Sequence, residues 1–258
     1  MEVIPVDISL HKPGVWKRFA AWLLDAILLC VLATGIAFVF SAAFGYDSYS
    51  DKLNAAYAEY EERYGISLGI TEDEYNALSE EKKQLYMEAS SALSADEEAN
   101  YNYNMVVNLS VLIVTLSLLC SYLVLELLVP VLLKNGQTVG KKVLSIALCR
   151  VDLVRITNLQ LAVRTVLGKF TVETMIPVYL VIMLLFGGIG VFGTVLLLAF
   201  AVAQLVIMSV THTNSLIHDL IAGTVAVDLT TQKLFGSSEE LLEYKKRLHA
   251  ARVAEQAY

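Results

Sequence analysis

Three long apolar stretches limit how this chain can fold. Residues 19–44 contain one charged side chain, Asp25, and residues 105–133 also contain one, Glu126. Residues 174–208 contain no formal charge over 35 positions. A helix that crosses the hydrocarbon core of a bilayer needs about 20 apolar residues. A mean hydropathy of +0.59 is too high for an ordinary soluble domain. The chain is therefore predicted to be an integral membrane protein.

The third stretch is long for one helix but sufficient for two short ones. A turn at residues 187–190, Gly-Gly-Ile-Gly, would divide it into a helical hairpin. One long, tilted helix is the alternative.

The distribution of charge between these stretches predicts an orientation. Residues 46–104 hold 14 acidic and 4 basic side chains, whereas residues 134–171 hold seven basic side chains and one acid. Lys and Arg are retained in cytoplasmic loops, so residues 134–171 and both termini are expected inside the cell and residues 46–104 outside. Residues 134–171 and the C-terminal segment are both expected inside the cell. The apolar stretch between them must therefore cross the membrane an even number of times, which favours the hairpin.

The predicted fold is an all-α polytopic protein of the cell membrane with four transmembrane helices. Its expected segments are an N-terminal cytoplasmic segment with the first helix (1–45), an acidic extracytoplasmic helical insertion (46–104), the second helix (105–133), a basic cytoplasmic strand and interfacial helix (134–171), the hairpin of helices three and four (172–209) and a cytoplasmic C-terminal segment (210–258).

The acidic insertion has the periodicity of a helix. Leu53, Tyr57, Tyr60 and Tyr64 recur at spacings of four, three and four. We expect a small helical hairpin whose tyrosines pack one helix on the other. A surface for a ligand or for another membrane protein is the alternative function of this insertion.

Two short segments alternate as strands do. Ile146 and Leu148 alternate with small or polar residues, and Val225 and Val227 do the same near the C-terminus. Pairing would satisfy their backbone groups, so a small cytoplasmic strand pair is predicted, half-buried on one face. Between them, an apolar helical stripe beside Arg164 and Lys169 predicts an interfacial helix whose basic side chains meet anionic lipid headgroups.

Three polar side chains are expected at a similar depth inside the bilayer. Asp25, Glu126 and Gln204 each lie seven or eight residues from the inner boundary of their helix, which is roughly 10–12 Å at about 1.5 Å per residue. Such a layer could bind a cation or pass a proton. Pro130 would free the carbonyl of Glu126 and Pro177 that of Glu173, a geometry that transporters use at ion sites.

A structural role for the same residues is the alternative. Arg18 lies two helical turns from Asp25, so the two side chains could pair, with Asp219 completing a polar network. Gln204 would then serve as a hydrogen-bonding contact between helices.

The residues that carry this polar layer also carry a family resemblance. Arg18, Asp25, the stretch GQTVGKKVLSIALCRVD from Gly136 and the stretch HDLIAGT from His218 together resemble the RDD family of prokaryotic membrane proteins. The family is named for one arginine and two aspartates, which correspond here to Arg18, Asp25 and Asp219. The resemblance covers residues 14–50 and 105–230, and the acidic insertion falls outside it. It implies a role that is largely undefined, with transport of unidentified ligands suggested and cation/proton exchange attributed to at least one member.

The function expected is therefore transport of a small solute or exchange of a monovalent cation for a proton through Asp25 and Glu126. Four helices are few for a carrier, so a homo-oligomer is expected. A non-transporting accessory protein of another membrane complex is the alternative. His212 and His218 lack further ligands at metal-binding spacing. We expect no metal, no cofactor, no nucleic-acid partner and no enzymatic activity.

Overall fold

The computed structural model describes residues 10–185 and 190–256. The chain separates into two compact units, one formed by Thr34–Ser117 and the other by Met1–Ala33 together with Leu118–Tyr258.

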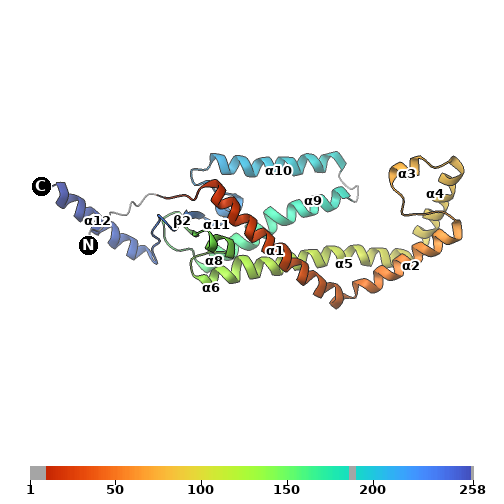
Figure 1. Cartoon of the computed structure of the whole chain (residues 1–258), viewed down its shortest axis with the longest axis horizontal. Coiled ribbons are helices and arrows are strands. Elements are labelled where there is room, and N and C mark those ends of the chain that lie inside the picture. The colour runs from red at the N-terminus through yellow and green to blue at the C-terminus, as the bar shows by residue number, and fades with distance from the viewer. Residues whose placement is uncertain (1–9, 186–189, 257–258) are drawn as a thin grey trace. The chain divides into compact units, whose positions relative to one another are not determined.

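Among the described residues, four helical segments are long and apolar enough to cross a membrane, as predicted (Figure 1). They are α1 (Val15–Phe44), then α5 (Glu97–Tyr122) continued by the π-helix η1 (Leu123–Leu128) and α6 (Val129–Leu133), then α8 (Asn158–Val163) continued by the π-helix η2 (Arg164–Met175) and α9 (Ile176–Leu185), and finally α10 (Gly190–Val210).

The third span begins earlier than the sequence predicted. The interfacial helix expected before residue 171 is continuous with the span and starts at Asn158, where Thr157 and Gln160 form a capping box. Arg164 and Lys169 were expected to reach lipid headgroups, and this prediction is wrong for both, because their side chains pair with carboxylates inside the larger unit.

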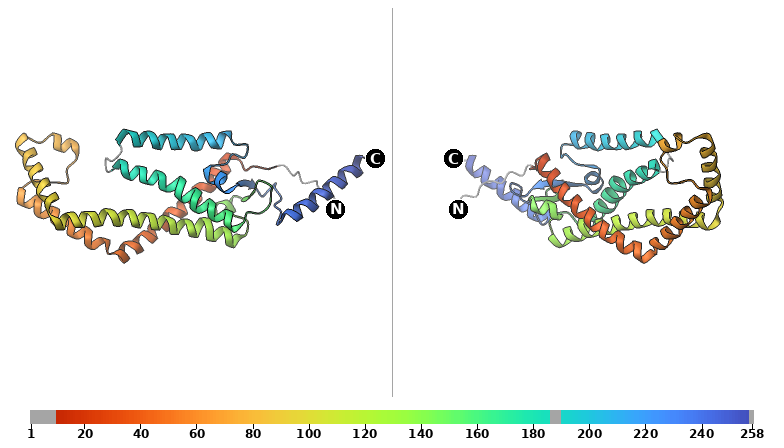
Figure 2. Two further views of the ribbon diagram at one scale, coloured as in Figure 1. Left: turned by 180° about the vertical axis from the view of Figure 1, so that it is seen from behind. Right: turned by 45° about the vertical axis from the view of Figure 1, so that its right-hand side comes forward.

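The third and fourth spans are separate helices, as the hairpin prediction required. Helix α9 ends at Leu185, α10 begins at Gly190, and the two helices contact each other. Figures 1 and 2 show them side by side. The turn predicted at residues 187–190 lies outside the described residues except for Gly190, which starts α10 with a φ of 45°.

The predicted strand pair is present. Strand β1 (Ile146–Arg150) pairs antiparallel with β2 (Thr224–Asp228), with Leu148 opposite Ala226. The expectation that only one face would be buried is wrong. One face packs on Phe235 and on Leu241 of α12 (Ser238–Gln256), and the other face packs on Ala21 of α1. The sheet thus anchors the first span, and with it the side chains that follow Ala21.

The unit formed by Thr34–Ser117 contains the predicted helical hairpin. Helix α2 (Tyr46–Tyr64) contacts α4 (Glu80–Ala95), with the short α3 (Glu72–Asn76) between them. Its core contains Tyr60, Leu68, Ala89 and Leu93, while Tyr57 and Tyr64 pack against this core. The tyrosine periodicity of the sequence therefore marks the face of α2 that packs on α4.

Candidate functional site

Asp25 is bound by a short helix that follows the second span. In α7 (Val139–Val143), the capping Thr138 donates its hydroxyl hydrogen bond to Asp25 Oδ2, and the Gly140 N–H donates to Asp25 Oδ1 at 2.7 Å. A Cβ at position 140 would lie 2.3 Å from the carbonyl oxygen of Ala21. Glycine is therefore required for α7 to approach α1 closely enough to bind the carboxylate.

Glu126 lies in η1 and is 5% exposed. Its Oε1 accepts a hydrogen bond from Lys169 of η2. Its Oε2 lies 3.8 Å from Lys141 Nζ and 4.0 Å from Arg164 Nη1. Three basic side chains therefore compensate one buried carboxylate, which would be costly to desolvate alone.

The main chain at Glu126 is also bound from η2. Pro130 cannot donate a backbone hydrogen bond to the carbonyl four residues earlier. The Thr165 hydroxyl donates to this Glu126 carbonyl at 2.9 Å. The second span is thus connected to the third span through both the side chain and the backbone of Glu126.

Lys141 connects the two intramembrane carboxylates. Its Nζ lies 3.9 Å from Asp25 Oδ2 and 3.8 Å from Glu126 Oε2. Burial lowers the pKa of Lys141 to about 8, although Glu126 acts in the opposite direction. The ammonium group therefore occupies the position between two carboxylates that a small monovalent cation would also favour.

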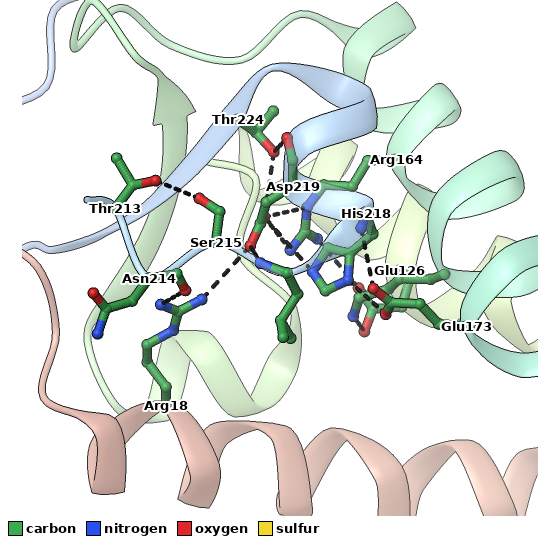
Figure 3. A network of polar contacts seen from close by, with 12 residues as sticks. Arg18, Glu126, Arg164, Glu173, Thr213, Asn214, Ser215, His218, Asp219 and Thr224 are labelled. Atoms are coloured by element: carbon green, nitrogen blue, oxygen red, sulfur yellow. Dashed lines mark hydrogen bonds and ion pairs between the residues drawn. The ribbon is translucent and has the colours of Figure 1, made fainter. Parts of the chain in front are cut away.

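Asp219 is the centre of a second group of contacts (Figure 3). It lies in α11 (Ile217–Ala222) and is fully buried. Arg164 donates to Asp219 Oδ1 from Nε at 3.1 Å and from Nη2 at 3.0 Å. Arg18 Nη2 lies 3.5 Å from Asp219 Oδ2, while its Nη1 donates to the Asn214 carbonyl at 2.6 Å. The Thr224 hydroxyl donates to Oδ1 at 3.3 Å.

Burial acts to raise the pKa of Asp219, but His218, Arg164 and Arg18 together hold that pKa well below its usual range. The carboxyl is therefore ionised at every physiological pH.

His218 extends this group toward the third span. Its Nδ1 lies 2.6 Å from Glu173 Oε2, and its main-chain N–H donates to Glu173 Oε1 at 3.0 Å. Gln204 of α10 interacts with the same carboxylate. Figure 3 shows His218 directed toward Glu173 and Asp219.

Together these side chains form one connected set, which we call the ionic cluster. It contains four acids and four bases, with His218 as a ninth member: Arg18, Asp25, Glu126, Lys141, Arg164, Lys169, Glu173, His218 and Asp219. Its formal charges cancel when His218 is neutral.

The polar residues singled out in the sequence are brought together in part. Asp25 and Glu126 meet through Lys141. Gln204 meets Glu173 instead, and its Oε1 is buried without a hydrogen-bond partner among the described residues. The structural alternative paired Arg18 with Asp25 and placed Asp219 in the same network; Arg18 in fact pairs with Asp219, because α11 lies beside the start of α1 and α7 already binds Asp25.

Sequence reasoning missed four members of the cluster. Lys141 is predicted only as one of the seven basic residues of the cytoplasmic segment, Arg164 and Lys169 are predicted to meet lipid headgroups, and Glu173 is singled out only for its backbone carbonyl. The sequence did contain a signal for them. Lys141, Arg164, Lys169 and Glu173 are charged residues close to apolar stretches whose own charged residues are only two acids, Asp25 and Glu126. Buried charges are usually paired, so these bases were candidates for the missing partners.

Comparison with known proteins gives one result. The model of the RDD family matches residues 12–223, a range that includes Arg18, Asp25 and Asp219. The curated proteins and the solved structures give no match.

Proposed function

Because the chain belongs to the RDD family of membrane proteins, we propose that it exchanges a small monovalent cation, bound between Asp25 and Glu126, for the proton that Lys141 releases there. The observation that carries this proposal is the position of Lys141, whose ammonium group lies within 4 Å of both carboxylates. When Lys141 is deprotonated, the ionic cluster has lost one positive charge, and one monovalent cation would restore its neutrality. The incoming cation and the departing proton then carry the same charge.

The charges within the ionic cluster favour exchange of a cation for a proton over simple binding of a cation. Lys169 already neutralises Glu126, so the exchangeable charge is the one that Lys141 supplies to Asp25. A bound cation next to protonated Lys141 would be repelled by its ammonium group. Cation and proton therefore compete for the site, which is the requirement for coupled exchange.

The test is exchange by purified protein in lipid vesicles that contain a pH-sensitive dye. Addition of sodium or potassium salt outside is expected to move protons in wild-type vesicles. Asp25→Asn and Lys141→Met should each lower this movement at least about tenfold, because each loses a contact to a charged group. The rate is expected to rise as the pH increases through about 8, where Lys141 loses its proton.

Matched controls are available close by. Lys142 is exposed beside Lys141, and Asp152 pairs with Arg150 at the surface. Lys142→Met and Asp152→Asn should both keep the wild-type rate. Wild-type protein that is folded but moves no protons under any cation gradient would exclude exchange and favour the accessory-protein alternative.

We also propose that the protein lies in the cell membrane with both termini in the cytoplasm. Support comes from the four basic residues of 134–171 outside the ionic cluster, Lys134, Lys142, Arg150 and Arg155, and from the acidic composition of residues 46–104. In a cysteine-free variant, a single cysteine at Ser67 should react with a membrane-impermeant maleimide on intact cells. A cysteine at Ser237 should react only after lysis, and the reverse pattern would contradict this orientation.

A further inference from the structure

His218 is held between two carboxylates from different elements (Figure 3). Its Nδ1 lies 2.6 Å from Glu173 Oε2, and its Nε2 lies 3.6 Å from Asp219 Oδ1. A neutral imidazole has one N–H and can donate to only one of them. An imidazolium has two, one directed to each carboxylate. The geometry therefore accommodates an additional proton on this ring.

The fold fixes the ring in this position. A Cβ at Gly168 would lie 2.6 Å from the Cβ of His218, so η2 approaches α11 as closely as glycine allows. The His218 N–H is bound to Glu173 as well. The backbone thus places the imidazole, with His218 5% exposed.

We propose that Glu173, His218 and Asp219 form a second proton-binding site, centred on the imidazole and coupled through Arg164 to Glu126. The proton-binding part stands on this geometry alone. Its link to transport rests on the proposed function.

Arg164 supplies the coupling because it faces both sites. Its Nε and Nη2 donate to Asp219, while Nη1 lies 4.0 Å from Glu126 Oε2 and makes no hydrogen bond among the described residues. A proton on His218 repels the guanidinium and competes for Asp219. Protonation of His218 therefore weakens the interaction between Asp219 and Arg164 and favours the attraction of Arg164 to Glu126.

The charged groups around the ring determine the pH range of this site. Burial lowers the pKa of His218 below its ordinary value, and Arg164 lowers it further, whereas Asp219 and Glu173 raise it. Arg18 of α1 pairs with Asp219, and Gln204 of α10 interacts with Glu173, so each contacts one of the two carboxylates beside the ring. His218 is therefore neutral at neutral pH and takes up its proton in acid.

The test is a direct titration of His218 by NMR, which needs no transport. The chain has four histidines, so His11→Gln, His212→Gln and His249→Gln together leave His218 as the only imidazole of the full-length protein in detergent micelles. Its ring signals should titrate with a midpoint below the ordinary value of about 6.5. In this background Glu173→Gln should lower the midpoint further, because it removes a negative charge beside the ring.

Two more variants test the coupling. Glu126→Gln should also lower the His218 midpoint, by less than Glu173→Gln, because it leaves the charge of Arg164 less compensated. Glu243→Gln, an exposed change on α12, should leave it unmoved.

Three results would overturn the proposal. These are a ring signal that stays constant between about pH 4 and pH 8, a midpoint at the ordinary value, or a midpoint that neither Glu173→Gln nor Glu126→Gln moves. Wild-type vesicles without proton movement would instead count against the proposed exchange and leave the titration result standing.

Discussion

Asp219→Ala is expected to destabilise the protein by about 3–5 kcal/mol. The substitution leaves two guanidinium groups, of Arg164 and Arg18, without their shared carboxylate, and the Arg164 side chain is 2% exposed. Domain stabilities are on the order of 5–15 kcal/mol, so this loss is a large part of the total. Chemical unfolding in detergent micelles, followed by circular dichroism, measures it.

A surface pair and a double variant serve as controls for this prediction. Asp152 pairs with Arg150 and both side chains are 42% exposed, so Asp152→Ala should change stability by less than about 1 kcal/mol. Adding Arg164→Met to Asp219→Ala should recover part of the loss, because it removes one uncompensated buried charge. Equal stability of Asp219→Ala and Asp152→Ala would show that Asp219 does not hold the buried arginines.

Gly140→Ala is expected to cost about 1–3 kcal/mol and to abolish cation-driven proton movement. The added methyl group would lie 2.3 Å from the Ala21 carbonyl oxygen, so α7 must move away from α1. This movement separates Asp25 from the Gly140 N–H and from Thr138, and it displaces Lys141. Thermal unfolding and the vesicle assay measure the two effects.

The same substitution at another glycine should have the opposite effect. A Cβ at Gly35, within α1, meets no atom within 4 Å. Alanine is favoured over glycine in a helix by up to about 1 kcal/mol, so Gly35→Ala should raise stability slightly and leave proton movement intact. A Gly140→Ala protein that behaves like Gly35→Ala would contradict the close approach of α7.

The spans were predictable because their physical requirement is local. A run of apolar residues long enough to cross a bilayer is visible without knowledge of any neighbour, and α1 and α10 follow such runs closely, whereas the second span begins at Glu97, before its run at residue 105. The strand pair was equally visible, because Val225 and Val227 alternate as a strand requires. Its second buried face was not visible, because Ala21 and Phe235 come from distant parts of the chain.

The ionic cluster was predictable only in part, for a related reason. Asp25 and Glu126 can be identified as candidates from the sequence, because each is the only charged residue in an apolar run. Arg164 and Lys169 do not, because a basic residue beside a span fits an interfacial position equally well. Their partners lie 55 and 43 residues away, so pairing depends on how the helices pack, which no local pattern specifies.

The distribution of these partners bears on how the chain enters the bilayer during synthesis. The third span carries Arg164, Lys169 and Glu173, and the groups that compensate them lie on η1 and α11. A Lys or Arg costs about 2.5–3.5 kcal/mol at the centre of a helix that inserts alone, so uncompensated charges on this span oppose its insertion. We therefore expect Glu126 to be in place before this span leaves the translocon, so that the second and third spans integrate as a pair.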